Sequence, residues 1–256
     1  MGYKNKVLSL ANRFVRFCPG MNKRRPTYYQ GYWHWLPASN WQSLFSSYEP
    51  NVGAAIKSNL SPGSIFFDIG ANVGWFTLFA SKIVGPLGQI YSFEPSPDVY
   101  ARLSENVRDL KNVHTFQYGI GNKDGELEFA SQGDSSAASF VEAVTEINKN
   151  YHPDTPIRKP CVEIRKLDSL LSQVKRPDLV KIDVEGFELE VLKGASNLLS
   201  QRPVLIVEIH PPQLKLSDGS EMEIFHLLES FGYSCDVIDR NPNSLYTIIA
   251  RASSPD

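Results

Sequence analysis

From residue 64 to the C-terminus, short apolar runs alternate with segments whose apolar residues recur at helical spacing. The apolar runs predict strands at 64–69, 89–93, 113–118, 179–182, 203–209, 233–238 and 245–250. The periodic segments predict helices at 75–84, 96–110, about 186–199 and 221–231. Strands that alternate with helices pack as a parallel sheet covered on both faces. The sequence therefore predicts the α/β class, with a doubly wound and mostly parallel sheet.

The alternation breaks between the third and fourth predicted strands. Segments 126–129 and 162–165 alternate apolar with charged residues, which is typical of half-exposed strands that pair with each other. The polar stretch between them, residues 131–159, is a loop of a length that is usually functional or disordered inside a compact domain. We interpret residues of about 124–166 as an inserted β-arm and loop within a domain spanning 61–256.

The first 60 residues form an N-terminal extension that is basic and aromatic. They hold eight of the 26 basic residues and one of the 28 acidic residues. Apolar residues between 7 and 18 recur at helical spacing, which predicts a basic amphipathic helix. We favour a helix docked on the main domain, and the alternative is peripheral contact of residues 1–25 with an anionic membrane surface. The aromatic residues between 28 and 48 predict a packed subdomain or, alternatively, a wall or lid over a binding site.

Composition excludes several classes of protein. The net charge of −2 argues against a dedicated nucleic-acid binder, which is usually strongly basic. Cys18, Cys161 and Cys235 form no CxxC pair, which argues against a disulfide scaffold or a structural zinc site and favours a reducing, cytoplasmic compartment. No run reaches the roughly 18 apolar residues that a membrane-spanning helix needs.

The segment FFDIGANVGWF leads from a predicted buried strand into a helix and carries Asp68, Gly70, Asn72 and Gly74. Gly70 permits a tight turn, and a helix that begins near Gly74 directs free backbone N–H groups toward a ligand. The segment lacks the GxGxxG pattern of a dinucleotide site. The Asp68 carboxylate would repel a phosphate but suits a cationic group, such as an amino group or a sulfonium.

Glu94 ends the next predicted strand, where an acidic side chain can accept both ribose hydroxyls of a nucleoside. Together with the glycine-containing turn, it predicts an adenosyl cofactor that lies across the carboxyl ends of the strands. Gly119 and Ile120 follow the third strand, where the adenine edge is expected.

A second group of polar residues follows the fourth and fifth predicted strands. Asp183 and Glu185 lie in KIDVEGFELEVLKGA, and the fifth strand ends in Glu208-Ile209-His210. We expect these four side chains beside the cofactor, with His210 or Asp183 as general base. The alternative is structural: the two carboxylates cap the following helix, and His210 is a buried polar residue.

The motifs DIGANVGWFTLFA, YSFEPSP, LVKIDVEGFELEVLKGA and VEIHP resemble the FkbM-type S-adenosylmethionine-dependent methyltransferases over about residues 60–212. The resemblance implies a Rossmann-like class I methyltransferase fold with seven strands, the last one antiparallel. It implies S-adenosyl-L-methionine as cofactor and direct displacement that O-methylates a sugar, glycan or natural-product hydroxyl. By this resemblance Asp68, Gly70, Asn72 and Gly74 form the cofactor loop, Glu94 binds the ribose, and Asp183 and Glu185 face the reaction centre. Residues 1–60 and 131–159 fall outside it, so the acceptor stays open.

Three alternatives remain at this point. Asp183, Glu185 and Glu208 offer hard oxygen ligands, so a metal-assisted O-methyltransferase would bind Mg²⁺ or Mn²⁺ there. An NAD(P)-dependent oxidoreductase would also use Glu94 on a ribose. A non-catalytic, membrane-associated module would keep the fold and use the basic N-terminal segment.

Overall fold

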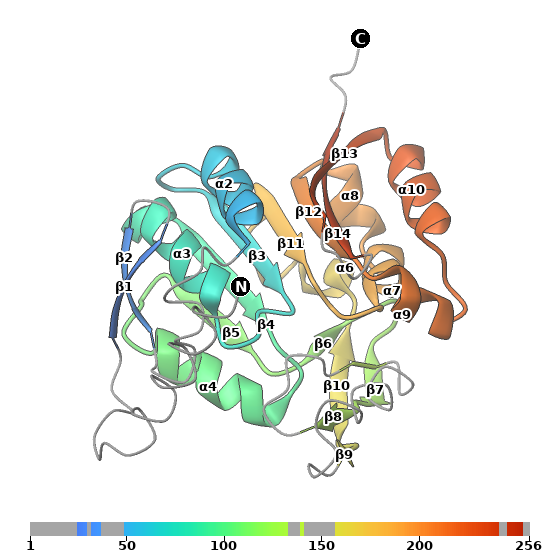
Figure 1. Ribbon diagram of the computed structural model, residues 1–256, viewed down its shortest axis with the longest axis horizontal. Coiled ribbons are helices and arrows are strands. Elements are labelled where there is room, and N and C mark those ends of the chain that lie inside the picture. The colour runs from blue at the N-terminus through green and yellow to red at the C-terminus, as the bar shows by residue number, and fades with distance from the viewer. Residues whose placement is uncertain are drawn as a thin grey trace, which may run out of the picture.

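Seven strands form one sheet in the order β13-β14-β12-β11-β3-β4-β5 in the computed structural model (Figure 1). The structure describes residues 25–29, 32–36, 49–132, 139–140, 157–240 and 245–252. The strands are β3 (Ile65–Ile69), β4 (Gln89–Phe93), β5 (Val113–Phe116), β11 (Leu179–Ile182), β12 (Val204–Ile209), β13 (Tyr233–Arg240) and β14 (Tyr246–Ala252). The central strands pair in parallel, and β14 pairs antiparallel with both neighbours. This confirms the predicted parallel sheet and its antiparallel last strand.

The chain changes direction across the sheet between β3 and β11. From β3 the chain adds β4 and β5 on one side, and after the insertion it adds β11 and β12 on the other side. In open α/β sheets, ligands bind outside the carboxyl ends of the strands at such a reversal of strand order. The candidate site is therefore expected where β3, β4 and β11 end.

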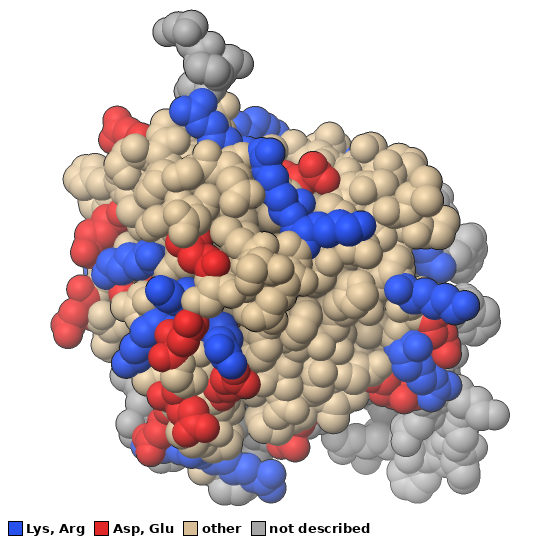
Figure 2. Space-filling model, turned by 180° about the vertical axis from the view of Figure 1, so that it is seen from behind, with Lys and Arg blue, Asp and Glu red and all other residues tan. Residues whose placement is uncertain are grey.

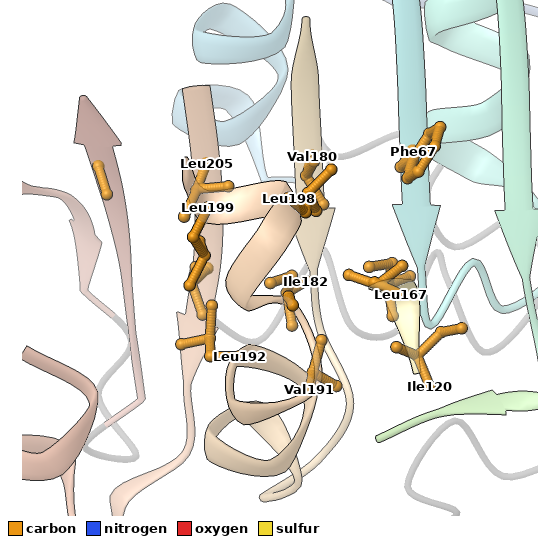
Figure 3. Packing of buried hydrophobic residues seen from close by; sticks show 14 of the residues in the cluster. Phe67, Ile120, Leu167, Val180, Ile182, Val191, Leu192, Leu198, Leu199 and Leu205 are labelled. Atoms are coloured by element: carbon orange, nitrogen blue, oxygen red, sulfur yellow. The ribbon is translucent and has the colours of Figure 1, made fainter. Parts of the chain in front are cut away.

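Two hydrophobic clusters cover the two faces of the sheet. One face packs against α2 (Pro50–Asn59), α3 (Trp75–Val84) and α4 (Pro97–Val107). The other packs against α6 (Leu167–Leu170), α7 (Glu188–Lys193), α8 (Ser196–Ser200) and α10 (Glu221–Ser230). Figure 3 shows side chains of α7 and α8 beside Val180 and Ile182 of β11. Because successive side chains of a strand point to opposite faces, Phe66 and Phe67 enter different clusters.

The single helix expected over about 186–199 is wrong. The chain forms α7 and α8 instead, with a break at Gly194 and Ala195. The carboxylate of Asp168 accepts the backbone N–H groups of Asn197 and Leu198, at 2.9 and 3.0 Å. These N–H groups would bond within a continuous helix, so a carboxylate from α6 starts a second helix here.

The insertion builds a small second sheet at the bottom of the view in Figure 1. It consists of β6 (Gly119–Ile120), β10 (Cys161–Arg165) and β7 (Gly125–Glu128). The antiparallel pairing of β7 with β10 confirms the pairing expected of segments 126–129 and 162–165. Beyond it, β8 (Ser131–Gln132) pairs antiparallel with β9 (Ile157–Arg158).

The described part of the N-terminal extension packs on the main sheet. The strands β1 (Arg25–Tyr29) and β2 (Tyr32–Leu36) form a hairpin, and β2 lies against α3 (Figure 1). The helix α2, which the sequence analysis did not anticipate, buries Val52 and Ile56. The basic helix expected over 7–18 lies outside the described residues.

The surface of the described residues shows mixed charge on the face seen in Figure 2, where blue and red side chains lie interspersed. None of the helices in the described ranges has both the length and the apolar character needed to cross a membrane.

Candidate active site

The turn between β3 and α3 crosses the carboxyl ends of three strands. Gly70 adopts φ +76°, and a Cβ there would lie 1.8 Å from the backbone oxygen of Asp183 at the end of β11. The N–H groups of Gly70 and Ala71 both donate to the carbonyl of Phe93 at the end of β4, at 3.0 Å. Only glycine fits this close approach, so Gly70 brings β3, β4 and β11 together at the strand reversal.

Glu94, at the tip of β4, is held by the backbone of this turn. Its two carboxylate oxygens accept the N–H groups of Asn72 and Ser96, at 3.0 and 2.9 Å. Burial raises the pKa of Glu94 to about 7, although these two hydrogen bonds oppose the rise. Ser96 occupies the N-cap position of α4, without a capping hydrogen bond from its side chain. A carboxylate has about four acceptor positions, so Glu94 can still accept ribose hydroxyls.

Asp68 lies beneath the turn and is 1% exposed. One of its oxygens, Oδ2, accepts the Thr77 hydroxyl at 2.6 Å, and Oδ1 has no hydrogen-bond partner. Burial raises the pKa of Asp68, and the nearby Lys181 ammonium opposes the rise. The structure thus gives Asp68 a buried, unsatisfied acceptor oxygen.

Lys181 is a functional candidate that the sequence analysis missed. It stands beside Asp68 in the register of β11 with β3, is buried, and donates from Nζ to Asp183 Oδ2 at 2.9 Å. Its ammonium also lies 5.1 Å from the centre of the Phe76 ring. The available signal was one lysine inside the otherwise apolar strand LVKI, where a buried charge requires a partner.

His210 and Glu188 form a buried ion pair behind the acidic group. His210 Nδ1 lies 2.8 Å from Glu188 Oε1, and His210 Nε2 lies 3.5 Å from Glu185 Oε2 and 4.0 Å from Asp183 Oδ1. Burial lowers the pKa of His210, but Glu188 and the other two carboxylates outweigh it and raise the pKa to about 10. His210 is therefore charged at neutral pH, which is at odds with its expected role as general base. Glu188 was missed because a glutamate in the first turn of a helix is usually exposed.

The remaining carboxyl groups differ in how readily they ionise. Burial acts to raise the pKa of Asp183, but Lys181 and His210 outweigh it and hold that pKa below its usual range. Burial raises the pKa of Glu185 to about 7 and, together with repulsion from Asp183, that of Glu208 to about 8. Glu208 therefore ionises less readily than Asp183. Glu185 is poised to exchange a proton near neutrality.

Asp183, Glu185 and His210 are close enough to hold a metal ion, because one ligand atom of each lies within 4.8 Å of the others. The sequence predicts Glu208 as the third ligand. Among the described residues the group that lies within this distance contains His210 in its place.

Comparison with known proteins identifies the family. The family model of the methyltransferase FkbM domain matches residues 68–235. The chain belongs to the FkbM methyltransferase family. Three relatives illustrate the match. Hexuronic acid methyltransferase AglP of Haloferax volcanii is 30% identical over 63% of this chain and 62% of its own length. The 2-O-methyltransferase NoeI of Sinorhizobium fredii is 29% identical over 70% of this chain and 80% of its own length. The 31-O-demethyl-FK506 methyltransferase FkbM of Streptomyces tacrolimicus is 27% identical over 72% of this chain and 77% of its own length.

The chain spans less than two thirds of the length of some of its relatives, 62% of AglP and 58% of Methyltransferase 1 of Beauveria bassiana.

Solved structures support the fold. The methyltransferase FkbM of Methylobacillus flagellatus superposes with a TM-score of 0.53 at 16% identity, over 75% of this chain and 44% of that one. Fibrillarin of Aeropyrum pernix, solved with natively bound S-adenosyl-L-methionine, superposes with a TM-score of 0.50 at 17% identity, over 93% of this chain and 86% of that one. This chain therefore has the expected Rossmann-like class I methyltransferase fold.

Proposed function

We propose that this protein transfers the methyl group of S-adenosylmethionine to a hydroxyl group of a sugar, glycan or natural-product acceptor. The main support is the excess of acidic groups where β3, β4, β11 and β12 end. Two buried cations, Lys181 and His210, lie among six carboxyl groups, which belong to Asp68, Glu94, Asp183, Glu185, Glu188 and Glu208. The pKa values of Glu94, Glu185 and Glu208 are raised to about 7, 7 and 8, so the excess of negative charge grows as pH rises through this range. A site with this imbalance favours a cationic ligand such as a sulfonium.

The residues at the strand ends fit that cofactor. Gly70 and Gly74 form the turn that would hold it, and Glu94 offers acceptor positions for its ribose hydroxyls. The unsatisfied oxygen of Asp68 offers a free acceptor under the turn. Gly119 and Ile120 stay a prediction for the adenine edge. Relatives named as hexuronic acid and 2-O-methyltransferases support a hydroxyl on a sugar as acceptor.

Glu185 is the base that we propose for the reaction. S-adenosylmethionine supplies a methyl group on a cationic sulfur, which is a good leaving group. The protein must then orient the acceptor hydroxyl and remove its proton, and a base with a pKa near 7 is well matched to this task. Glu185 has such a pKa, whereas Asp183 is a weaker base and His210 is already protonated. His210 then orients the carboxylate of Glu185 from 3.5 Å.

The test combines ligand binding with methyl transfer. Calorimetry should detect binding of S-adenosylhomocysteine, and labelled S-adenosylmethionine should methylate one of a panel of glycans that contain hexuronic acids. Glu185→Gln should lower turnover by about 10²–10⁴-fold and leave binding of S-adenosylhomocysteine intact. Glu190→Gln is the matched control, because Glu190 is a nearby glutamate of α7 that pairs with Lys193. No binding of either ligand by folded protein would refute the proposal.

The pH dependence of cofactor preference tests the same electrostatics. The pKa of both Glu94 and Glu185 is raised to about 7, so these side chains become negatively charged as pH rises through 7. The affinity for cationic S-adenosylmethionine should therefore increase relative to neutral-sulfur S-adenosylhomocysteine between pH 6 and pH 8. Calorimetry at both pH values measures this ratio, and a constant ratio would contradict the assignment.

Metal-assisted methyl transfer is a second candidate, favoured by the grouping of Asp183, Glu185 and His210. A divalent ion there would bind the acceptor oxygen and lower the pKa of its hydroxyl. His210 must lose its proton to become a ligand, so binding of the metal would release protons. Activity that survives exhaustive treatment with EDTA would rule out this version.

The other two alternatives are separated by ligand binding. An oxidoreductase would bind NADH in place of S-adenosylhomocysteine, and the match to a methyltransferase family speaks against it. A non-catalytic module would show no transfer of labelled methyl groups to cell extracts or glycans.

A further inference from the structure

Two residues of the insertion, Ser139 and Phe140, lie against the turn that carries Glu185. Ser139 is 1% exposed, and its hydroxyl donates to the backbone carbonyl of Glu185 at 2.8 Å. Its backbone forms a bridge with Ala130, in which each N–H donates to the other carbonyl at 3.0 Å. Ser139 thus connects the end of β7 with a turn that is 46 residues away in sequence.

Phe140 completes the contact through three aromatic rings. Its ring centre lies 4.9 Å from that of Phe129 and 5.0 Å from that of Phe187, two residues after Glu185. Its ring also fills the space above Gly119, where a Cβ would lie 2.3 Å from the Phe140 ring. The absence of a side chain at Gly119 therefore leaves room for the ring of Phe140. This role is separate from the contact with adenine that is predicted for Gly119.

The turn needs outside support because its backbone is unusual. Glu185 has φ +51°, a left-handed conformation that is unfavourable for a residue with a side chain, and Gly186 follows with φ +95°. Within the main domain, Glu188 accepts the N–H of Gly186 at 2.9 Å. Ser139 is the contact from the insertion, and it holds the carbonyl of Glu185 itself.

We propose that Ser139 and Phe140 are positioning residues through which the insertion sets the orientation of the Glu185 carboxylate. This inference rests on the proposed function, in which Glu185 removes the proton of the acceptor. The hydroxyl of Ser139 fixes the peptide plane after Glu185, and Phe140 holds that segment against Phe187. The insertion and the carboxylate of Glu185 are thereby parts of one packed unit.

The test observes Glu185 directly by NMR, in protein labelled with ¹³C at the glutamate side-chain carboxyl carbon. Glu185→Gln identifies the Glu185 signal by its loss. Ser139→Ala should shift that signal, because the left-handed turn relaxes when its carbonyl loses the hydroxyl. Ser81→Ala is the matched control, since the buried Ser81 hydroxyl also donates to a backbone carbonyl, that of Leu78, at 2.9 Å.

A second variant covers the case in which Ser139→Ala does not fold. Phe140→Leu keeps an apolar side chain and removes the ring contacts, and it should shift the Glu185 signal in the same way. A Glu185 signal that does not shift in any folded variant would refute the proposed positioning role of Ser139 and Phe140. Calorimetry with S-adenosylhomocysteine on the unsubstituted protein tests the proposed function separately, so the two can fail independently.

Discussion

Replacing Glu188 with Gln removes one negative charge beside His210 and keeps a side chain of nearly the same size. The two groups lie 2.8 Å apart and are almost fully buried. The pKa of His210 is raised from 6.5 to about 10. At 1.36 kcal/mol per pKa unit, the fold stabilises the imidazolium by roughly 5 kcal/mol. Since Glu188 is the strongest of the attractive partners, Glu188→Gln should remove about 2–3 kcal/mol of this.

The change should be visible in two measurements. In NMR titrations the His210 ring should lose its proton closer to its ordinary pKa of 6.5 in Glu188→Gln than in the unsubstituted protein. Because the pKa of His210 is raised by folding, its stabilisation is fully present below pH 6.5 and is lost as pH rises through about 10. Urea unfolding at pH 7 and pH 10 should therefore show a smaller pH-dependent loss in Glu188→Gln. Glu190→Gln, on the same helix, should leave both measurements unchanged, and an unaltered His210 titration in Glu188→Gln would refute this reasoning.

Two substitutions test the packing under the site by urea unfolding. Gly70→Ala should cost about 3 kcal/mol or more, because its Cβ would meet the backbone oxygen of Asp183 at 1.8 Å. Gly63→Ala is its control, because Gly63 has φ +92° but no other group lies within 4 Å of the position that its Cβ would take. Gly63→Ala should therefore cost about 1–2 kcal/mol. Equal losses for the two variants would contradict the close approach at Gly70. Lys181→Met should cost about 2–3 kcal/mol, since it leaves the half-buried Asp183 carboxylate without its partner at 2.9 Å. Lys193→Met breaks an exposed ion pair and should cost about 0–1 kcal/mol, and a similarly small loss for Lys181→Met would show that Asp183 does not depend on it.

The sheet could be predicted from sequence because its strands are buried runs bounded by polar residues. The strand β11 matches its predicted range, 179–182, and β4 matches 89–93. The break between α7 and α8 could not be predicted, because it depends on Asp168, a capping residue 29 positions before Asn197. Apolar periodicity continues through the break and carries no sign of it.

The site could be predicted in part. The expected acids at the strand ends do meet, since the carboxyl ends of β11 and β12 are neighbours. The sequence did not indicate which of them are charged. That depends on Lys181 and Glu188, whose burial follows from packing across the sheet and from the contact with His210. A histidine that looks like a base in sequence is therefore a cation in the folded protein.

The pairing of β8 with β9 has a consequence for how new specificities could be built on this fold. Gln132 lies opposite Ile157, so the chain between them departs from and returns to the domain at adjacent points. Doubling the length of a flexible loop adds only about 0.6 kcal/mol to the cost of closing it. The stretch between these two residues can thus change in length at low cost, provided that Ser139 and Phe140, which contact the turn of Glu185, are kept.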